Sequence, residues 1–184
     1  MKKRLNINSK IGFSQRSGCR TKRGFTIIEV VLVLAIAGLI MMMVFIALPG
    51  LQRSQRDSQR TQDISRLAAA LAQYQSNNRG KLPTADNING SFKKRYLTVN
   101  GDTFEDPDGL KYTIKREDCT SDCNNKTYDS LPQYKATSNT RTITVFVKAR
   151  CTGNEDNPIT YQSNTRKAAV TYVKEGGGVI CVDV

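Results

Sequence analysis

One carboxylate, Glu29, lies at the start of the most apolar segment of this 184-residue sequence. It is followed by nineteen consecutive apolar or glycine residues, 30–48. A charged side chain inside a membrane is disfavoured by about 2.5–3.5 kcal/mol, so such a residue usually faces a partner. Glu29 therefore either pairs with a cation, as a docking element, or lies solvated at the boundary of the lipid headgroups.

Residues suited to catalysis are few in this chain. There is no histidine, which removes the usual general base, the commonest proton shuttle and the commonest metal ligand. The sequence also has no glycine-rich phosphate loop and no plausible nucleophile–base set. We therefore predict that the protein is not an enzyme and needs no cofactor. A membrane-anchored enzyme that uses Ser, Lys or paired carboxylates is a distant alternative, as is a membrane-anchored binding domain.

The apolar segment 30–48 is the element that positions Glu29. As a helix it would span roughly 28 Å, close to a bilayer core of about 30 Å, and it lacks the polar face of a soluble helix. Residues 1–24 hold eight of the 28 basic residues and no acidic one, whereas the other 160 residues hold 20 basic and 16 acidic residues. This basic flank predicts a single-pass protein of the cytoplasmic membrane with its carboxy-terminal part outside.

The order of signals around this segment is not that of a secretory signal peptide. Such a peptide carries a small-residue cleavage site after its apolar run, but here the run is followed by LPGLQRSQRDSQR. The small residue at the boundary between the basic flank and the apolar segment is Gly24, which lies before the apolar run. The segment is therefore either an uncleaved anchor or is cut between Gly24 and Phe25, which leaves the apolar helix in the mature protein.

The stretch KRGFTIIEVVLVLAIAG resembles the class III signal of type IV pilins and of the pseudopilins of type II secretion and competence systems. The matching positions are a basic residue, the glycine before the cut, an aromatic first mature residue, a threonine and a carboxylate at the fifth mature position: Arg23, Gly24, Phe25, Thr26 and Glu29. The resemblance implies that a prepilin peptidase removes the leader 1–24 by cutting after Gly24 and N-methylates Phe25. The leader is longer than in many such proteins.

The same resemblance implies a role for Glu29 and a set of partners. Glu29 would pair with the amino group of Phe25 on a neighbouring subunit, which sets the docking register because a mismatch leaves a buried charge unpaired. The partners would be further copies in a helical filament, other pilins, the prepilin peptidase, membrane lipid, and an assembly ATPase that acts through a platform membrane protein. The product would be an extracellular pilus or a cell-surface filament.

Two functions in this family are compatible with the sequence. The first is a structural filament subunit, a type IV pilin, used for adhesion, twitching motility or DNA uptake. The alternative is a pseudopilin that acts as a short piston in type II secretion or competence. Direct nucleic-acid binding is not indicated, because the chain beyond residue 24 has a net charge of only +4 and no recognisable nucleic-acid module. The basic residues that could form a face for DNA are 93–95, Arg141, Lys148, Arg150, Arg166 and Lys167.

The resemblance also implies an α+β, type IV pilin-like fold. A helix would run from residue 25 to about 78, with a transmembrane or filament-core half at 25–49 and an amphipathic half at 50–79. Pro49 and Gly50 would kink this helix or mark a helix boundary. In the second half the apolar stripe would be Leu51, Ile64, Leu67, Ala68, Leu71 and Tyr74, with charged residues, Arg60 among them, on the other faces. Gly80 would cap the helix, and a globular head with a small antiparallel sheet would occupy 80–184.

Strands are predicted in the head at 96–99, 110–115, 142–149, 167–174 and 178–184, which are rich in β-branched and aromatic residues. Between the first two, FEDPDGLKY resembles a turn common in pseudopilins and some pilins, and its Asp, Pro and Gly residues suit turn positions. The carboxylates that could gather a calcium ion there are Asp102, Glu105, Asp106 and Asp108. Their spacing lacks the ligand pattern of an EF-hand, so a solvated turn is the alternative.

Four cysteines, Cys119, Cys123, Cys151 and Cys181, lie in the part predicted to be outside. An even number in an exported domain favours two disulfides, and four cysteines allow three pairings. We carry forward Cys119–Cys123, which would close a very short loop, and Cys151–Cys181, which would pin the carboxy-terminal region as in pilins. The other pairings, which would tie the 119–123 loop to the sheet, stay open.

Overall fold

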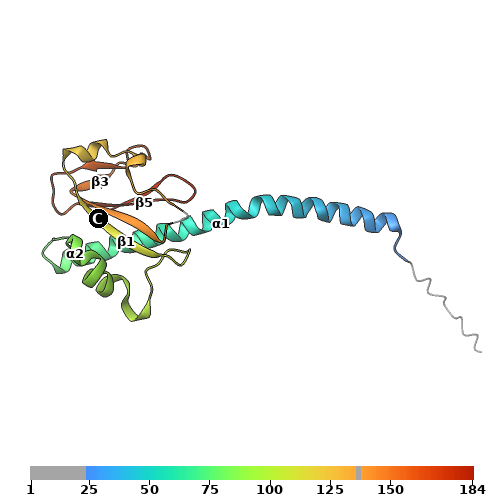
Figure 1. Ribbon diagram of the computed structural model, residues 1–184, viewed down its shortest axis with the longest axis horizontal. Coiled ribbons are helices and arrows are strands. Elements are labelled where there is room, and N and C mark those ends of the chain that lie inside the picture. Colours follow the sequence, from blue (N-terminus) through green and yellow to red (C-terminus); the bar gives the residue numbers. More distant parts are fainter. Residues whose placement is uncertain (1–23, 136–137) are drawn as a thin grey trace, which may run out of the picture. The chain divides into compact units, whose positions relative to one another are not determined.

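The computed structural model describes residues 24–135 and 138–184 of the chain. They form two units, one that extends to Met43 and one that comprises Val44–Val184. The helix α1 (Ile27–Asn77) begins in the first unit and continues into the second, where it lies against a small β-sheet (Figure 1). The predicted α+β layout of a long helix and a small β head is confirmed.

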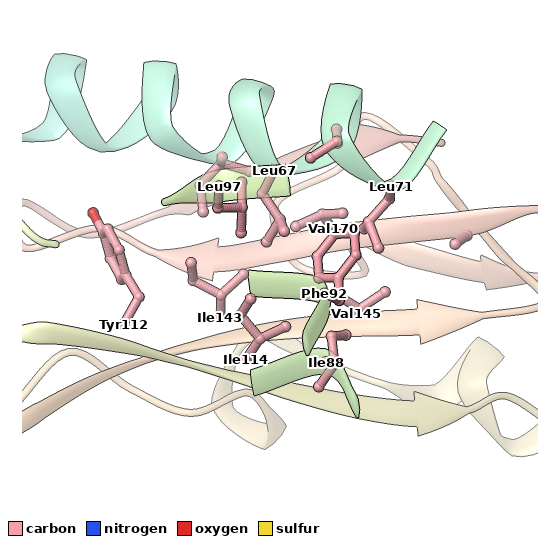
Figure 2. Close-up of a cluster of buried hydrophobic side chains, with 14 of the residues drawn as sticks. Leu67, Leu71, Ile88, Phe92, Leu97, Tyr112, Ile114, Ile143, Val145 and Val170 are labelled. Carbon is pink, nitrogen blue, oxygen red and sulfur yellow. The ribbon is translucent and has the colours of Figure 1, made fainter. Parts of the chain in front are cut away.

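The carboxy-terminal half of α1 is amphipathic. Its buried residues are Arg60, Ile64, Leu67, Ala68, Ala70 and Leu71. Apolar side chains at three- and four-residue spacings fall on one face of a helix, and this face packs on the sheet (Figure 2). Two assignments to the helix faces are wrong, because Leu51 is 59% exposed instead of buried and Arg60 is completely buried instead of exposed.

Helix α1 continues through Pro49 and Gly50, so a helix boundary at this point is wrong, while a kink there stays a prediction. The helix ends in a cap formed by two residues. Arg79 adopts the left-handed conformation with φ 56°, and the N–H of Gly80 donates to the carbonyl of Gln75 at 2.8 Å, the long hydrogen bond of a Schellman motif. Gly80 takes part in the predicted cap, but Arg79 holds the left-handed position next to the helix.

The main sheet has four strands in the order β1-β2-β5-β6. They are β1 (Lys111–Asp118), β2 (Thr140–Val147), β5 (Ala168–Val173) and β6 (Val179–Asp183). β2 pairs antiparallel with β5, and β5 with β6, but β1 pairs parallel with β2, so the sheet is mixed instead of purely antiparallel. The long connection between β1 and β2 returns the chain to the end where β1 began, which a parallel pair requires.

A second sheet was not predicted. It pairs β3 (Ala149–Cys151) with β4 (Ile159–Tyr161). The predicted strand 142–149 divides at Lys148, whose φ of 60° turns the chain from β2 in the main sheet to β3 in the small one. A positive φ at a non-glycine residue has no strong signal in the sequence, which explains why the division was missed.

The predicted strand 96–99 is wrong. Residues 85–97 and 99–101 are helical, in α2 (Ala85–Asn87), η1 (Ile88–Leu97), which is interrupted at Gly90, and the single turn η2 (Val99–Gly101). Ile88, Phe92 and Leu97 are all buried, at spacings of four and five residues that suit a helix face better than strand alternation. Burial of these side chains outweighs the strand preference of YLTV.

The main sheet is covered on both faces. Because side chains alternate between the faces of a strand, β2 and β5 contribute to two apolar clusters. Val145 and Val170 belong to the cluster between the sheet and α1 (Figure 2). Phe146 and Ala169 belong to the second cluster, which includes the buried cysteines of the 119–123 loop. The two strands in the centre of the sheet therefore contribute to the core on both faces.

Candidate functional site

The peptide bond between Gly24 and Phe25 lies just outside α1. Residues 24–26 are not helical, and the carbonyl of Thr26 accepts the first helical hydrogen bonds, from the N–H groups of Glu29 at 3.2 Å and Val30 at 3.3 Å. Phe25 is 85% exposed, and apart from Gly24 and its chain neighbours no described atom lies within 4 Å of the point where a side chain on Gly24 would begin. A peptidase can therefore reach this bond without unwinding the helix.

Glu29 lies in the first turn of α1, where a carboxylate interacts favourably with the helix macrodipole. Phe25 and Glu29 are four residues apart, and with Val30, Val33 and Leu34 they line a shallow hollow of about 330 Å³. Within residues 24–135 and 138–184, Glu29 forms no ion pair, in contrast to the acidic residues of the head described below. The carboxylate is open to a cation supplied from elsewhere.

The apolar half of α1 has no partner in the part of the chain that the structure describes. Every residue from 24 to 51 is exposed, and the large apolar side chains between Ile27 and Leu51 expose 41% to 86% of their surface. Helix α1 is long and apolar enough to cross a membrane. Apolar surface of this extent marks a site of contact with lipid or with other protein chains.

A second cluster, of opposite character, joins the carboxy-terminal half of α1 to the head. The side chain of Arg60 is completely buried and forms two parallel hydrogen bonds with Asp106, from Nε to Oδ1 at 2.8 Å and from Nη2 to Oδ2 at 2.9 Å. Nη1 also donates to Asp57 at 2.9 Å and to Glu175 at 3.0 Å, and Nη2 donates to Asp108 at 2.9 Å. These five residues, the Arg60 network, connect α1 with the 106–109 turn and with the turn between β5 and β6.

The charges of the Arg60 network depend on one another. Burial disfavours the charged form of Arg60, but hydrogen bonds with Asp106, Asp57 and Glu175 outweigh burial and raise the pKa of the guanidinium. Burial acts to raise the pKa of Asp106 as well, but the hydrogen bonds and charge of Arg60 prevail and lower it. Removing either partner would leave the other as an uncompensated buried charge.

Two further arginines surround this network. Arg56 donates to both carboxylate oxygens of Glu175, at 2.7 and 2.9 Å, and Arg141 donates to Asp108 at 3.1 Å. The guanidinium of Arg141 also lies over the ring of Tyr134, 4.3 Å from its centroid. Since Arg141 is only 3% exposed, its assignment to an exposed basic face is wrong.

The turn predicted in FEDPDGLKY is confirmed, because the N–H of Gly109 donates to the carbonyl of Asp106 at 2.8 Å and Gly109 has φ 79°. Of the four carboxylates considered for calcium, Asp106 and Asp108 are bound by arginines, and Asp102 forms an ion pair with Arg66. In the described ranges, no three His, Cys, Asp or Glu residues are grouped so as to hold a metal ion. Arginine side chains therefore supply the positive charge at this turn.

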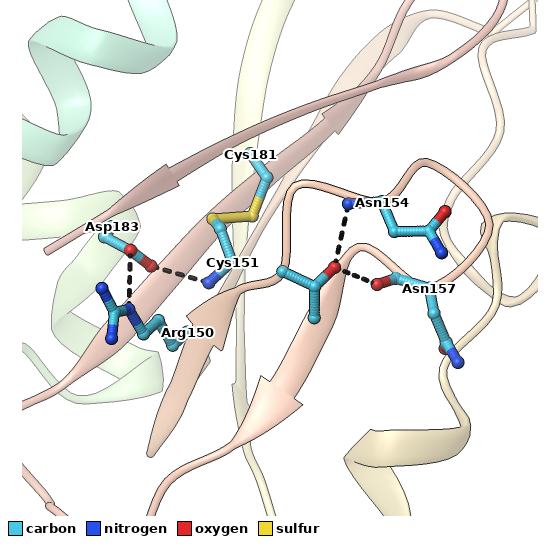
Figure 3. The surroundings of a disulfide bond; sticks show 7 residues. Arg150, Cys151, Asn154, Asn157, Cys181 and Asp183 are labelled. Carbon is cyan, nitrogen blue, oxygen red and sulfur yellow. Dashed lines mark hydrogen bonds and ion pairs between the residues drawn. A yellow bond between two sulfur atoms is a disulfide. The ribbon is translucent and has the colours of Figure 1, made fainter.

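The four cysteines of the head form the disulfides Cys119–Cys123 and Cys151–Cys181. These are the two pairs that we predicted from the sequence. Figure 3 shows that Cys151–Cys181 joins the small sheet to β6 of the main sheet, beside Asp183. Asp183 accepts a hydrogen bond from the backbone N–H of Cys151 at 2.7 Å and one from Arg150 at 3.4 Å. The bond closes a segment of 30 residues and fixes the last strand.

Sequence reasoning missed the Arg60 network, although a signal for it exists. Arg60 precedes Ile64, Leu67 and Leu71 by four, seven and eleven residues, in phase with the apolar stripe of α1. A charged residue in such a position must be paired if it is buried. The sequence alone could not select Asp106, 46 residues away, from the acidic residues of the chain.

Comparison with known proteins bears on the amino-terminal segment. The family model of the prokaryotic N-terminal methylation motif matches residues 19–45, which identifies the class III signal of type IV pilins and pseudopilins in this chain. No curated protein and no solved structure matches the chain. The motif supports a type IV pilin-like or pseudopilin-like protein, a structural and generally non-enzymatic class. It implies processing by a prepilin peptidase and assembly into pilus-like oligomers.

The motif and the apolar helix together fit a membrane-anchored protein that exposes its head. The Gly24–Phe25 bond, Glu29 and the exposed apolar part of α1 all lie within or next to the matched residues 19–45. These features therefore form the candidate site for processing and assembly. The Arg60 network lies outside the match, in the second half of α1 and in the head.

Proposed function

We propose that this chain is a structural subunit of an extracellular, type IV pilus-like filament, polymerised through its amino-terminal helix. The observation that carries the proposal is the uncovered apolar surface between Ile27 and Leu51, which begins at the methylation motif. Before assembly, lipid would cover this surface. After assembly, the same residues of neighbouring copies would cover it, so that subunits leave the membrane without exposing apolar surface to water.

Processing would come first. The precursor would insert with its basic leader in the cytoplasm, and a prepilin peptidase would cut the exposed bond between Gly24 and Phe25. The cut creates a new ammonium group at Phe25, which the same enzyme would methylate. The non-helical conformation of residues 24–26 supports this step, because the bond to be cut takes no part in the hydrogen bonds of α1.

The carboxylate of Glu29 would then direct docking. An ammonium–carboxylate pair in an apolar filament core is favourable only in the register that joins the two charges, because other registers leave a charge buried without a partner. Glu29 is open in the described chain and borders a hollow together with Phe25. A neighbouring subunit that places its own amino terminus there would satisfy both charges.

The energy for assembly would come from partners, namely an assembly ATPase that acts through a platform membrane protein. The head would serve as a preformed building block. Its two disulfides and the Arg60 network link α1, the turn 106–109 and the strands internally, which suits a part that is carried into the filament without refolding.

The test is the amino-terminal sequence and intact mass of the protein recovered from cells, together with electron microscopy of material sheared from the cell surface. We expect a chain that starts at Phe25, carries one added methyl group and is present in the sheared filaments. A chain that starts at Met1 although an active prepilin peptidase is present would contradict the proposal. Correct processing without any surface filament would instead favour the pseudopilin alternative.

A further inference from the structure

One end of the head carries cations that lack ion-pair partners in the described chain. Arg79 and Lys81 flank the cap of α1, and Arg166 and Lys167 immediately precede β5. These segments lie side by side, because the side-chain amide of Gln75 donates to the carbonyl of Arg166 at 2.8 Å. A Cβ atom on Gly80 would likewise lie only 2.7 Å from Nε of Arg166. All four side chains are exposed, and we call these four residues the cationic end.

The opposite end of β5 carries an acidic group formed by Asp129, Glu155 and Asp156. The backbone N–H of Tyr128 donates to the carbonyl of Asp156 at 3.1 Å, which brings the two segments together. The three acidic residues line an open hollow of about 530 Å³ beside Gly178, in the turn between β5 and β6. Among the described residues, one ion pair involves this group, that of Glu155 with Lys174, whose Nζ lies 3.9 Å away. We call these three residues the acidic end.

The two ends cannot neutralise each other within one subunit. They are separated by the length of β5, six residues or about 20 Å. This exceeds the Debye length of about 8 Å at physiological ionic strength, so attraction across the head is screened. Lys174 offsets one charge of the acidic end. The remaining charge of each end can be neutralised at close range by salt ions or by another molecule.

We propose that the acidic end of one subunit docks on the cationic end of the next subunit along the filament. The proposal rests on the proposed filament function and names the surface through which the heads would contact one another. A contact between two different patches of identical chains does not close on itself unless the rotation forms a ring, so repetition builds an open helical assembly. Parallel subunits anchored by the same helix all present their cationic ends in one direction, as this contact requires.

A second copy of the chain fits these surfaces better than a separate polyanion. A polyanion would account for the cationic end alone, whereas a second copy accounts for both ends with complementary charge. The cationic end has four cations and the acidic end three carboxylates, one of which also faces Lys174. Complementary charge favours correct orientation and suppresses contacts between like ends. Because the charges are exposed, the contact weakens as the salt concentration rises.

Charge reversal in cells tests the proposal. The first variant is Lys81→Glu/Arg166→Glu at the cationic end, the second is Glu155→Lys/Asp156→Lys at the acidic end, and the third combines all four changes. We expect each double variant to lower the yield of sheared filament about tenfold, because attraction becomes repulsion, and the combined variant to restore most of the yield. The matched control is Lys94→Glu/Arg95→Glu, which makes the same change of charge on exposed residues of η1 and should assemble normally.

Disulfide cross-linking provides a second measurement on the same full-length protein. Lys81→Cys/Glu155→Cys should give a ladder of covalent multimers when intact filaments are oxidised, and Lys94→Cys/Glu155→Cys should not. Normal filament yield in either double charge variant, or a combined variant no better than the doubles, would overturn the docking of the two ends. If the unaltered protein is processed but forms no filament, the filament function itself fails, and this inference falls with it.

Discussion

The two halves of α1 differ in whether their charged side chains are paired within the chain. The amino-terminal half exposes apolar side chains and one carboxylate, Glu29, without an ion-pair partner in the described chain. The carboxy-terminal half buries Arg60 completely and surrounds it with four carboxylates. Among the described residues, one half leaves its carboxylate and its apolar surface without a partner, whereas the other half pairs its buried charge within the chain.

This difference shows how to tell an assembly element from a structural one. A buried charge with a full set of hydrogen bonds has a role inside the fold, and its loss affects folding first. A charge in an apolar surface with no partner in the same chain is a position for recognition, and its loss affects association first. Substitutions at Arg60 and Glu29 should therefore separate stability from assembly.

The largest effect is expected for Arg60→Met. The change keeps an unbranched side chain but leaves Asp106 buried without its guanidinium, which should destabilise the head by about 3–5 kcal/mol. Thermal unfolding of the full-length protein in detergent, followed by near-ultraviolet circular dichroism, measures this loss. All seven tyrosines lie between residues 74 and 172, and there is no tryptophan, so the signal comes largely from the head.

The control for this change is Arg53→Met. Arg53 lies on the same helix, but its side chain is 61% exposed, so its removal should cost less than about 0.5 kcal/mol. The double variant Arg60→Met/Asp106→Leu should recover part of the loss, because replacing both partners of a buried pair is far less costly than removing one. Equal melting temperatures for Arg60→Met and the unaltered protein would show that the network does not hold the head.

A somewhat smaller loss is expected when Cys151 and Cys181 are both replaced by serine. The disulfide closes 30 residues, and the chain-entropy model assigns such a loop about 3–4 kcal/mol. The tyrosine signal should show a lower melting temperature, with processing at Phe25 unchanged. Reduced processing in this variant would indicate that the head influences the amino-terminal segment, which would contradict separate roles for the two halves of α1.

A feature of this protein could be predicted from the sequence when residues close together in the chain determine it. The methylation motif and the apolar helix are local patterns, so their positions follow from neighbouring residues, and the processing site and the role of Glu29 stay predictions. Four of the five predicted strands are local patterns of the same kind. The parallel pairing of β1 with β2, the helical fold of 85–101 and the partners of Arg60 depend on contacts between distant segments. A single sequence does not rank such alternatives, and there the predictions were wrong or missing.

The next effect concerns assembly alone. Glu29→Gln keeps the shape of the side chain but removes its charge, so the amino terminus of a docked neighbour would lose its partner. If the unpaired amino terminus costs about 2.5–3.5 kcal/mol, as a charge inside a membrane does, the yield of sheared filament should fall roughly 100-fold or more. The melting temperature of the head should not change, because Glu29 is exposed and lies outside the head. Glu29→Asp retains the charge and should assemble better than the Gln variant, whereas equal yields of all three proteins would contradict a docking role.

The smallest expected effect is the change in the stability of the head with acid, and its direction follows from the pKa shifts. Arg60 lowers the pKa of Asp106 against the effect of burial, and Arg56, the main cause at Glu175, lowers the pKa of that carboxyl. A carboxyl with a lowered pKa stabilises the fold fully above its unfolded value, near 4, and loses this contribution as the pH falls through the folded value. Stability should hence be level from pH 8 to about 5, since the chain has no histidine, and then decline.

In the Arg60→Met variant the contribution of Asp106 should reverse. Without the guanidinium, burial acts alone and raises the pKa of Asp106, so protonation relieves a buried charge and stabilises the fold as the pH falls. Burial already raises the pKa of Asp63 in the unaltered protein, which offsets part of the acid-induced loss in both proteins. The destabilisation caused by Arg60→Met, measured by urea unfolding, should therefore shrink between pH 6 and pH 3. A constant difference across this range would mean that Asp106 finds another cation in the variant, with Arg141, 3.7 Å away, as the nearest.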